Sequence, residues 1–262
     1  MCPNRDKSHD LVRALSNWRQ WNPSLRSAPK LVHPLSSGLS HGSFRVASGM
    51  QHFVVRIESP GSRQLAMPKR QELTAMALAG TLAPTVVWSD ETTLVTKFEA
   101  GHHWQPPQQL ESLAKHLQQL HRLPSEGKLP ELDLLRHCNG YWHQRPDIQE
   151  QEKFTRGITH LRENLERFPE RRFCHVDLNP ANILQRQDEF IFLDWEYAAV
   201  CSPYFDLASI IEFGGLDEAQ TQAFCHYYWG EQNDDKHFKA IAEFQKIVRF
   251  VEWLWLRLAN ID

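Results

Sequence analysis

His175-Val176-Asp177-Leu178-Asn179-Pro180-Ala181-Asn182 is the stretch that decides the fold of this chain of 262 residues. It places an Asp and an Asn five positions apart, a spacing at which a tight loop can turn both side chains into one cleft. Phosphoryl transfer needs a carboxylate to receive the proton of the attacking hydroxyl, oxygen ligands for Mg²⁺, and a cation near the triphosphate. We therefore predict that Asp177 is the catalytic base and that the amide oxygen of Asn182 binds Mg²⁺.

The residues that follow extend this pattern. A hairpin is predicted from Ile183-Leu184 to Phe190–Leu193, and Asp194 stands where its second strand ends. An Asp after a strand is more often a turn or helix cap than a metal ligand. Here, however, Asp194 follows the Asp177 and Asn182 pair in the sequence, and its carboxylate could hold a metal that bridges the phosphates. We therefore predict Asp194 as the second Mg²⁺ ligand.

Elements of different kinds occupy the two parts of the chain. A helix is predicted over 8–22 and a second over 69–82. Three strands are predicted between these helices and two after the second helix. The predicted strands are Lys30–Leu35, Phe44–Ala47, Phe53–Ile57, Thr85–Trp88 and Thr92–Phe98. Helices are predicted over 108–121, over 148–168 and through most of the chain after Phe205. This order predicts an α+β fold with an N-terminal lobe over 1–98, a C-terminal lobe over 99–262, and a hinge near Phe98–Gly101.

Composition excludes several classes of protein. The chain is 41% hydrophobic and 23% charged with a net charge of −3, which is typical of a folded protein and gives no basic surface for nucleic acid. Its five cysteines never form a C-x-x-C pair, so we expect neither a disulfide framework nor a zinc site, and a cytoplasmic location. The most apolar stretch, 247–258, contains three charges, so no membrane span is predicted. Nothing in the sequence indicates an oligomeric state.

These motifs resemble those of the aminoglycoside phosphotransferase and choline kinase group within the protein-kinase-like fold. The resemblance runs from about Leu31 to the C-terminus and is most specific at 175–182 and at 193–198, Leu-Asp-Trp-Glu-Tyr-Ala. Within the group, segments 37–44 and 53–56 make it most similar to bacterial thiamine kinases. The resemblance implies a small β-rich N-lobe, a larger and mainly helical C-lobe, and ATP and Mg²⁺ as cofactors. It also implies Asp177 as base and Asn182 and Asp194 as metal ligands.

A loose glycine-containing loop over 36–43 is a candidate lid over the phosphates. Gly38 and Gly42 would let backbone N–H groups approach phosphate oxygens, and Ser40 and Ser43 would add donors. Taken alone, the segment is more typical of a plain hairpin turn. We predict phosphate binding because of its position between two strands.

The phosphate-pairing Lys that the family pattern places on the third strand is replaced by Arg56. Arginine stays protonated and can pair with phosphate oxygens in bidentate fashion, so the role is chemically preserved. Glu72 on the following helix could orient Arg56. With Lys69 and Arg70 beside it, Glu72 could equally belong to a solvated mixed-charge face.

One backbone segment and two further residues have roles implied by the fold. The backbone from Thr96 to Phe98 is expected beside the adenine base, as in kinase-like hinge strands. Asp206 resembles the family's second buried acid, and we interpret Asp206 and His175 as structural support for the catalytic loop rather than as proton carriers.

The acceptor is expected to be a small molecule with a hydroxyl and a cationic group, such as thiamine or choline. Aromatic faces with nearby carboxylates bind such cations, and Trp195 with Glu196 is the best-placed pair. The alternative is that the nine tryptophans serve the core. Two other classes stay open: an ATP-binding pseudokinase, suggested by Arg56, and a protein kinase, which the lack of an Ala-Pro-Glu run disfavours.

Overall fold

The computed structural model describes residues 4–21, 25–35, 41–58, 68–232 and 234–259. Contacts within the chain divide it into two compact units, the first ending at Gly101 and the second beginning at His102. Among the described residues, the first unit has a larger sheet and two α-helices, whereas the second unit is mainly helical. This distribution confirms the predicted α+β class.

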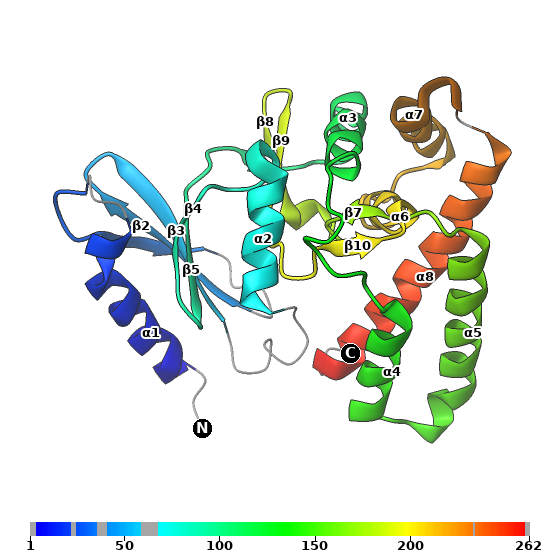
Figure 1. Cartoon of the computed structure of the whole chain (residues 1–262), viewed down its shortest axis with the longest axis horizontal. Helices are drawn as coiled ribbons and strands as arrows, with labels where there is room; N and C mark the ends of the chain where they lie inside the picture. Colours follow the sequence, from blue (N-terminus) through cyan, green and yellow to red (C-terminus); the bar gives the residue numbers. More distant parts are fainter. Residues whose placement is uncertain (1–3, 22–24, 36–40, 59–67, 233, 260–262) are drawn as a thin grey trace. The chain divides into compact units, whose positions relative to one another are not determined.

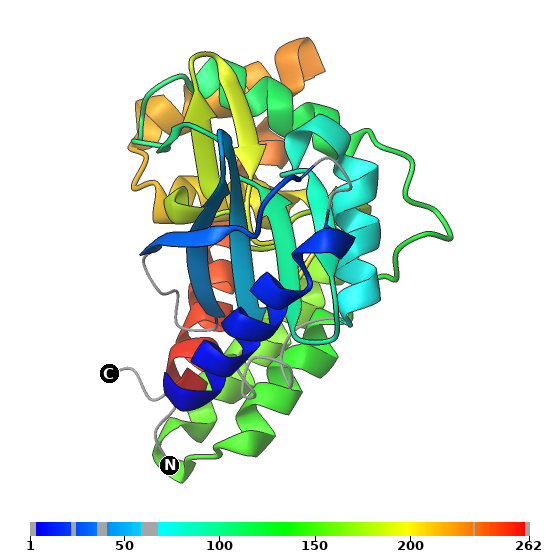
Figure 2. The ribbon, with the colours of Figure 1, turned by 90° about the vertical axis from the view of Figure 1, so that its left-hand side faces the viewer.

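The first unit is built on a five-stranded antiparallel sheet in the order β1-β2-β3-β5-β4. Its strands are β1 (Lys30–Pro34), β2 (His41–Ser48), β3 (Gln51–Glu58), β4 (Val86–Ser89) and β5 (Thr93–Lys97). Helix α1 (Asn4–Ser16) covers one face of the sheet and helix α2 (Lys69–Ala79) the other (Figures 1 and 2). All five predicted strands are therefore confirmed.

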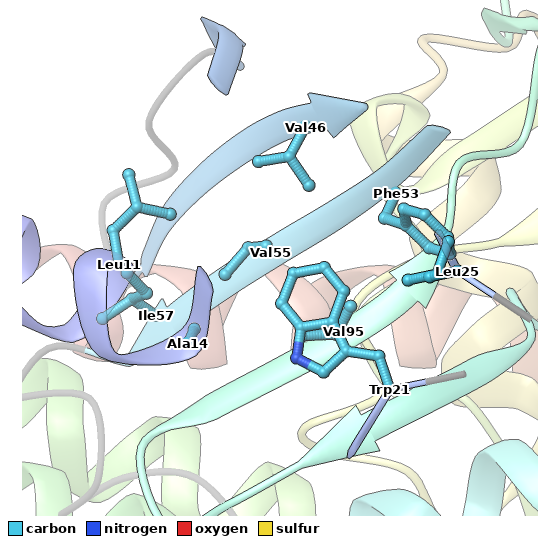
Figure 3. Packing of buried hydrophobic residues seen from close by; sticks show 9 residues of the cluster. All are labelled: Leu11, Ala14, Trp21, Leu25, Val46, Phe53, Val55, Ile57 and Val95. Atoms are coloured by element: carbon cyan, nitrogen blue, oxygen red, sulfur yellow. The ribbon is translucent and has the colours of Figure 1, made fainter. Parts of the chain in front are cut away.

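Alternation along β3 explains why this strand has an apolar face and a face with charged side chains. Phe53, Val55 and Ile57 are buried, and they pack with residues of α1 in the cluster that Figure 3 shows. Burying an aliphatic or aromatic side chain of this size contributes about 1.5–3 kcal/mol. Because successive strand residues point to opposite faces, Arg56 lies on the other side of the sheet, toward α2.

The turn between β2 and β3 follows the predicted Ser48-Gly49 pair. Ser48 pairs with Gln51 across the hairpin, and Gly49 has a φ of 59°. A two-residue hairpin loop needs a positive φ at its first position, which glycine adopts without strain. Strand β2 begins at His41 rather than at the predicted Phe44.

In the described part of the second unit, six α-helices and two small sheets are present. The helices are α3 (Leu110–His121), α4 (Leu134–Gln144), α5 (Gln151–Arg167), α6 (Pro203–Phe213), α7 (Glu218–Trp229) and α8 (Asp235–Ala259). The strands are β6 (His102–His103), β7 (Arg172–Cys174), β8 (Ile183–Arg186), β9 (Glu189–Phe192) and β10 (Ala199–Cys201). One sheet has the order β6-β8-β9, and β7 pairs with β10.

Helix α6 is the centre of this unit. It is buried from Pro203 to Ile211, and it packs against α8, the longest helix (Figure 1). The predicted helices over 108–121 and 148–168 are confirmed as α3 and α5. Helix α4 was not predicted, because its Asn139 and Gly140 favour helix weakly and its stability comes from buried Cys138 and Trp142. Within the described ranges, no helix is long and apolar enough to cross a membrane.

Gly157 lies where α5 packs against the Phe250 ring of α8. A Cβ at this position would overlap the buried ring of Phe250, whereas a Cβ at Gly140 on α4 would meet nothing within 4 Å. Both glycines lie inside helices, so their substitution by alanine separates helix propensity from packing.

We predict that Gly157→Ala lowers the free energy of unfolding by about 1–3 kcal/mol, because the added methyl group overpacks the α5–α8 contact. The matched variant Gly140→Ala should instead raise it by about 0.5–1 kcal/mol, the helix-propensity gain alone. Urea denaturation of both variants measures the difference. Equal effects of the two substitutions would contradict the close packing.

Candidate active site

The backbone of the predicted catalytic loop is held by one buried carboxylate. Backbone N–H groups of His175 and Val176 donate to Oδ2 and Oδ1 of Asp206 at 2.8 and 2.7 Å. Asp206 is fully buried in the first turn of α6, where the helix dipole favours a negative charge. Hydrogen bonds to a charged acceptor are each worth about 1.5–3 kcal/mol, so Asp206 fixes the start of the loop.

Two side chains that the sequence did not single out support Asp206. Nε2 of His121 lies 3.1 Å from Asp206 Oδ2, and Nδ1 of His121 lies 2.6 Å from the Tyr228 hydroxyl. Since the carboxylate can only accept, His121 donates through Nε2 and accepts from the phenol through Nδ1. His121, Cys174 and Asp206 are close enough to hold a metal ion. Because both Asp206 oxygens already accept N–H groups, we interpret the group as a hydrogen-bonded support.

Val176 adopts a backbone conformation that β-branched residues rarely take. Its φ is 74°, in the left-handed region. Such a residue persists only where its surroundings enforce the conformation, and the hydrogen bond from Val176 N–H to Asp206 does so here. The strain therefore indicates that the next residue, Asp177, is held in a specific direction.

Asp177 and Asn182 meet across a single turn of 3-10 helix at Pro180–Asn182. Nδ2 of Asn182 donates to the Asp177 carboxylate at 2.7 Å and to its carbonyl oxygen at 3.0 Å. The turn starts at Asn179, whose side chain accepts from Ala181 N–H at 3.0 Å and donates to Asp177 at 3.2 Å. The structure thus brings together the two residues that the spacing predicted. The Oδ1 atom of Asn182 is the one left to face a metal.

Asp194 lies at the same end of the β8–β9 hairpin as Asn182. Ile183 pairs with Phe192, and Leu193 N–H donates to the Asn182 carbonyl oxygen at 2.8 Å. Asp194 itself has a φ of 63°, a second left-handed residue in the site. Its charge is close enough to act on Asp177.

The pKa of the Asp177 carboxyl is raised from its usual 3.8 to about 7. Burial is the largest cause, followed by the negative charge of Asp194 and, more weakly, Glu196, while the hydrogen bonds from Asn179 and Asn182 oppose the shift. A carboxylate with a pKa near neutrality can accept a proton efficiently at that pH. Its environment therefore suits a general base.

The donor set fits Mg²⁺. Amide and carboxylate oxygens are the ligands this ion prefers, and Asn182 and Asp194 supply one of each. The repulsion between Asp177, Asp194 and Glu196 that raises the pKa of Asp177 is also what a bound cation would relieve.

Glu196 is buried, with an exposed fraction of 4%. Two phenols that the sequence did not single out share its surroundings. Burial raises the pKa of Tyr141 and of Tyr197, and the charges of Glu196 and Asp177 raise both further. Tyr197 follows the Asp-Trp-Glu run and could have been noticed there, whereas Tyr141 lies on α4 and no sequence signal pointed to it.

Trp195 belongs to the core, contrary to its predicted role at the substrate. It is 1% exposed, its ring packs edge-on against His175 at 4.6 Å, and its indole N–H donates to the Phe192 carbonyl at 2.7 Å. A side chain buried on these sides has no face to offer a cation. The pair of rings instead supports the predicted scaffold role of His175, which is fully buried.

In the first unit, Arg56 forms an ion pair with Glu72. Glu72 is 2% exposed, so it is not part of a solvated mixed-charge face. Lys69 Nζ lies 3.3 Å from the other carboxylate oxygen of Glu72 and also pairs with Glu58. The sequence suggested the Arg56–Glu72 pair but not the part that Lys69 plays in it.

The predicted lid residues divide into two sets. Gly38 and Ser40 lie outside the described residues. Gly42 and Ser43 belong to β2, where they pair with Ile57 and Arg56 of β3. They are therefore strand residues rather than loop residues, which corrects the predicted end of the lid.

The predicted adenine-facing backbone is already used within the sheet. Thr96 pairs with Val54 and Val86, and Phe98 N–H donates to the His52 carbonyl at 3.0 Å. The Phe98 ring is covered by the guanidinium of Arg45 at 4.0 Å. The Phe98 N–H is therefore not directed at a base, which does not fit the predicted contact there.

The chain is similar to known proteins in sequence and in fold. A family model described as the phosphotransferase enzyme family matches residues 32–237. Protein LicA of Haemophilus influenzae is 36% identical over 95 residues, 32% of this chain and 34% of LicA, so the match spans about a third of that relative. A thiamine kinase of Shigella boydii is 29% identical over 187 residues, 68% of this chain and 66% of the kinase.

Two solved structures share the fold. Choline kinase LicA from Streptococcus pneumoniae has a TM-score of 0.74 at 16% identity, covering 95% of this chain and 91% of that chain. A LicA structure in complex with AMP has a TM-score of 0.74 at 18% identity, covering 96% and 90%. At these identities the likeness shows the fold alone, and it confirms the predicted protein-kinase-like class.

The raised pKa of Asp177 predicts that the site destabilises the protein as pH rises. The folded protein keeps the proton up to about pH 7, whereas the unfolded chain loses it near pH 4, so the free energy of unfolding falls between these values. Asn cannot ionise at this position. Between pH 4 and pH 8, the free energy of unfolding of Asp177→Asn should therefore rise by about 2–4 kcal/mol relative to that of the wild type. Urea denaturation without metal or nucleotide measures this.

Asp188→Asn is the matched control, because Asp188 is exposed in the turn between β8 and β9. It should follow the pH profile of the wild type. Parallel profiles for wild type and Asp177→Asn would show that the charge of Asp177 carries no penalty in the folded protein.

Proposed function

Since this chain belongs to the phosphotransferase enzyme family, we propose that it transfers the γ-phosphate of ATP to a primary hydroxyl of a small molecule, with thiamine as the first candidate. The observation that carries the proposal is the Asp177 carboxylate, held by Asn182, with a pKa near 7. A base of this kind can take the proton of a hydroxyl at neutral pH.

The proposed reaction uses few side chains. As the acceptor oxygen forms a bond to the γ-phosphorus, its proton passes to Asp177, and the bond from the γ-phosphorus to the bridging oxygen breaks to release ADP. Bound Mg²⁺ would neutralise charge on the phosphates, and Asn182 Oδ1 and Asp194 are the groups that would hold it. Asp206 keeps the loop in place through backbone hydrogen bonds and takes no proton.

For the nucleotide, we assign Arg56 to the phosphates, oriented by Glu72. Arginine presents a planar fork of donors that matches phosphate oxygens. The LicA structure solved in complex with AMP supports nucleotide binding by this fold. ATP and Mg²⁺ are therefore the proposed cofactors.

For the acceptor, we assign Glu196 to a cationic group. The charges of Glu196 and Asp177 both act on Tyr141 and on Tyr197, and the charge of Glu196 also acts on Asp177. These four side chains therefore lie close together. A buried carboxylate beside phenol rings suits a quaternary nitrogen. Thiamine is favoured over choline because the thiamine kinase match covers 68% of this chain and the LicA match 32%.

Choline or ethanolamine and aminoglycosides are the alternative acceptors, and a pseudokinase is the alternative from another class. The pseudokinase hypothesis rests on Arg56 in place of lysine. The ion pair of Arg56 with Glu72 and the association of Asp177 with Asn182 weigh against it, because a silent site has no need of either.

The test is ADP release from ATP and Mg²⁺ in the presence of thiamine, choline, ethanolamine or kanamycin. We expect turnover with thiamine, and we expect Asp177→Ala to lower kcat by about 10²–10⁴-fold, the scale of general-base loss. Asp188→Ala, an exposed Asp on the neighbouring hairpin turn, should keep wild-type kcat.

Two outcomes would change the conclusion. Turnover with choline while thiamine is inert would replace the acceptor and keep the reaction. Tight ATP binding without ADP release for any acceptor would favour the pseudokinase.

A further inference from the structure

Four charged side chains form a continuous chain of ion pairs in the first unit. In order, they are Arg56, Glu72, Lys69 and Glu58. Their side chains are only 11%, 3%, 15% and 14% exposed. Ion pairs this far from solvent are weakly screened, so the position of each charged group depends on its partners in this series of ion pairs.

The sequence places these charges on two facing elements. Arg56 and Glu58 are two residues apart on β3 and share the face opposite the apolar cluster of Val55 and Ile57. Lys69 and Glu72 are one turn apart at the start of α2. The ion pairs therefore join the end of β3 to the first turn of α2.

Glu72 contacts two cations, one through each carboxylate oxygen. Oε1 pairs with Nη2 of Arg56, and Oε2 lies 3.3 Å from Nζ of Lys69. A carboxylate and a guanidinium readily form two parallel hydrogen bonds when nothing else competes for the second oxygen. Lys69 competes for the second oxygen of Glu72, and the ion pair with Glu58 keeps Lys69 in place.

We propose that Lys69 is a positioning residue for nucleotide binding. By holding Oε2 of Glu72, Lys69 prevents Glu72 from turning both oxygens toward Arg56, and so sets the plane in which the Arg56 guanidinium meets phosphate. This inference rests on the proposed function, in which Arg56 binds the phosphates.

The experiment is calorimetric titration of ATP into the full-length protein with Mg²⁺, together with KM measurements for ATP and acceptor. Lys69→Met should weaken ATP binding and raise KM for ATP about 10-fold, while KM for the acceptor stays within about 2-fold. Lys69→Arg should restore most of the affinity. Arg70→Met, the exposed neighbour on the same helix, should bind ATP as the wild type does.

A double-mutant cycle with Glu72→Gln separates positioning from direct contact. If Lys69 acts through Glu72, Lys69→Met should weaken ATP binding by less than about 2-fold in the Glu72→Gln background. An undiminished 10-fold loss there would mean that Lys69 binds phosphate itself, which would overturn the positioning role. Thermal unfolding of each variant shows whether it remains folded at the titration temperature.

The two proposals fail in different ways. A wild-type protein that binds ATP but transfers no phosphate contradicts the proposed function and leaves the titration of Lys69→Met as a valid test. Wild-type affinity in Lys69→Met contradicts the inference alone. A wild-type protein that binds no ATP contradicts both.

Discussion

The hydrogen bonds from two consecutive backbone N–H groups to the buried carboxylate of Asp206 are the constraint on which the site depends. They hold Val176 in a left-handed conformation that its side chain disfavours, and they do so from α6, the most buried helix of the second unit. A buried charge would normally be costly, but two N–H groups and the His121 imidazole satisfy it. The position of Asp177 is thus determined by helix packing rather than by the loop alone.

The charged side chains of the two units are arranged differently. In the first, Arg56, Glu72, Lys69 and Glu58 form a neutral set in which each carboxylate pairs with at least one cation. In the second, burial and, next, the negative charges of Asp194 and Glu196 raise the pKa of Asp177. The first arrangement holds the Arg56 guanidinium in place, whereas the second carries an electrostatic penalty that a bound cation or a proton on Asp177 would relieve.

Local patterns in the sequence predicted what local geometry decides. The contact of Asp177 with Asn182 followed from their spacing of five residues, and strand β3 followed from the β-type run Phe53–Ile57. Features that depend on packing of distant elements did not follow. Trp195 looked available because of its acidic neighbours, but the rings around it bury it, and the support of Asp206 by His121 joins residues 85 positions apart. Such contacts have no periodicity or spacing that a single sequence displays.

The most direct test of the central claim is the hydrogen exchange of the His175 and Val176 amides in wild type and in Asp206→Asn. The account predicts that both amides are protected in the wild type and exchange about 10–100-fold faster in the variant, the loss expected for a charged acceptor. Amides of the β8–β9 hairpin should keep their protection. Unchanged exchange at residues 175 and 176 in a folded variant would show that Asp206 does not hold the loop.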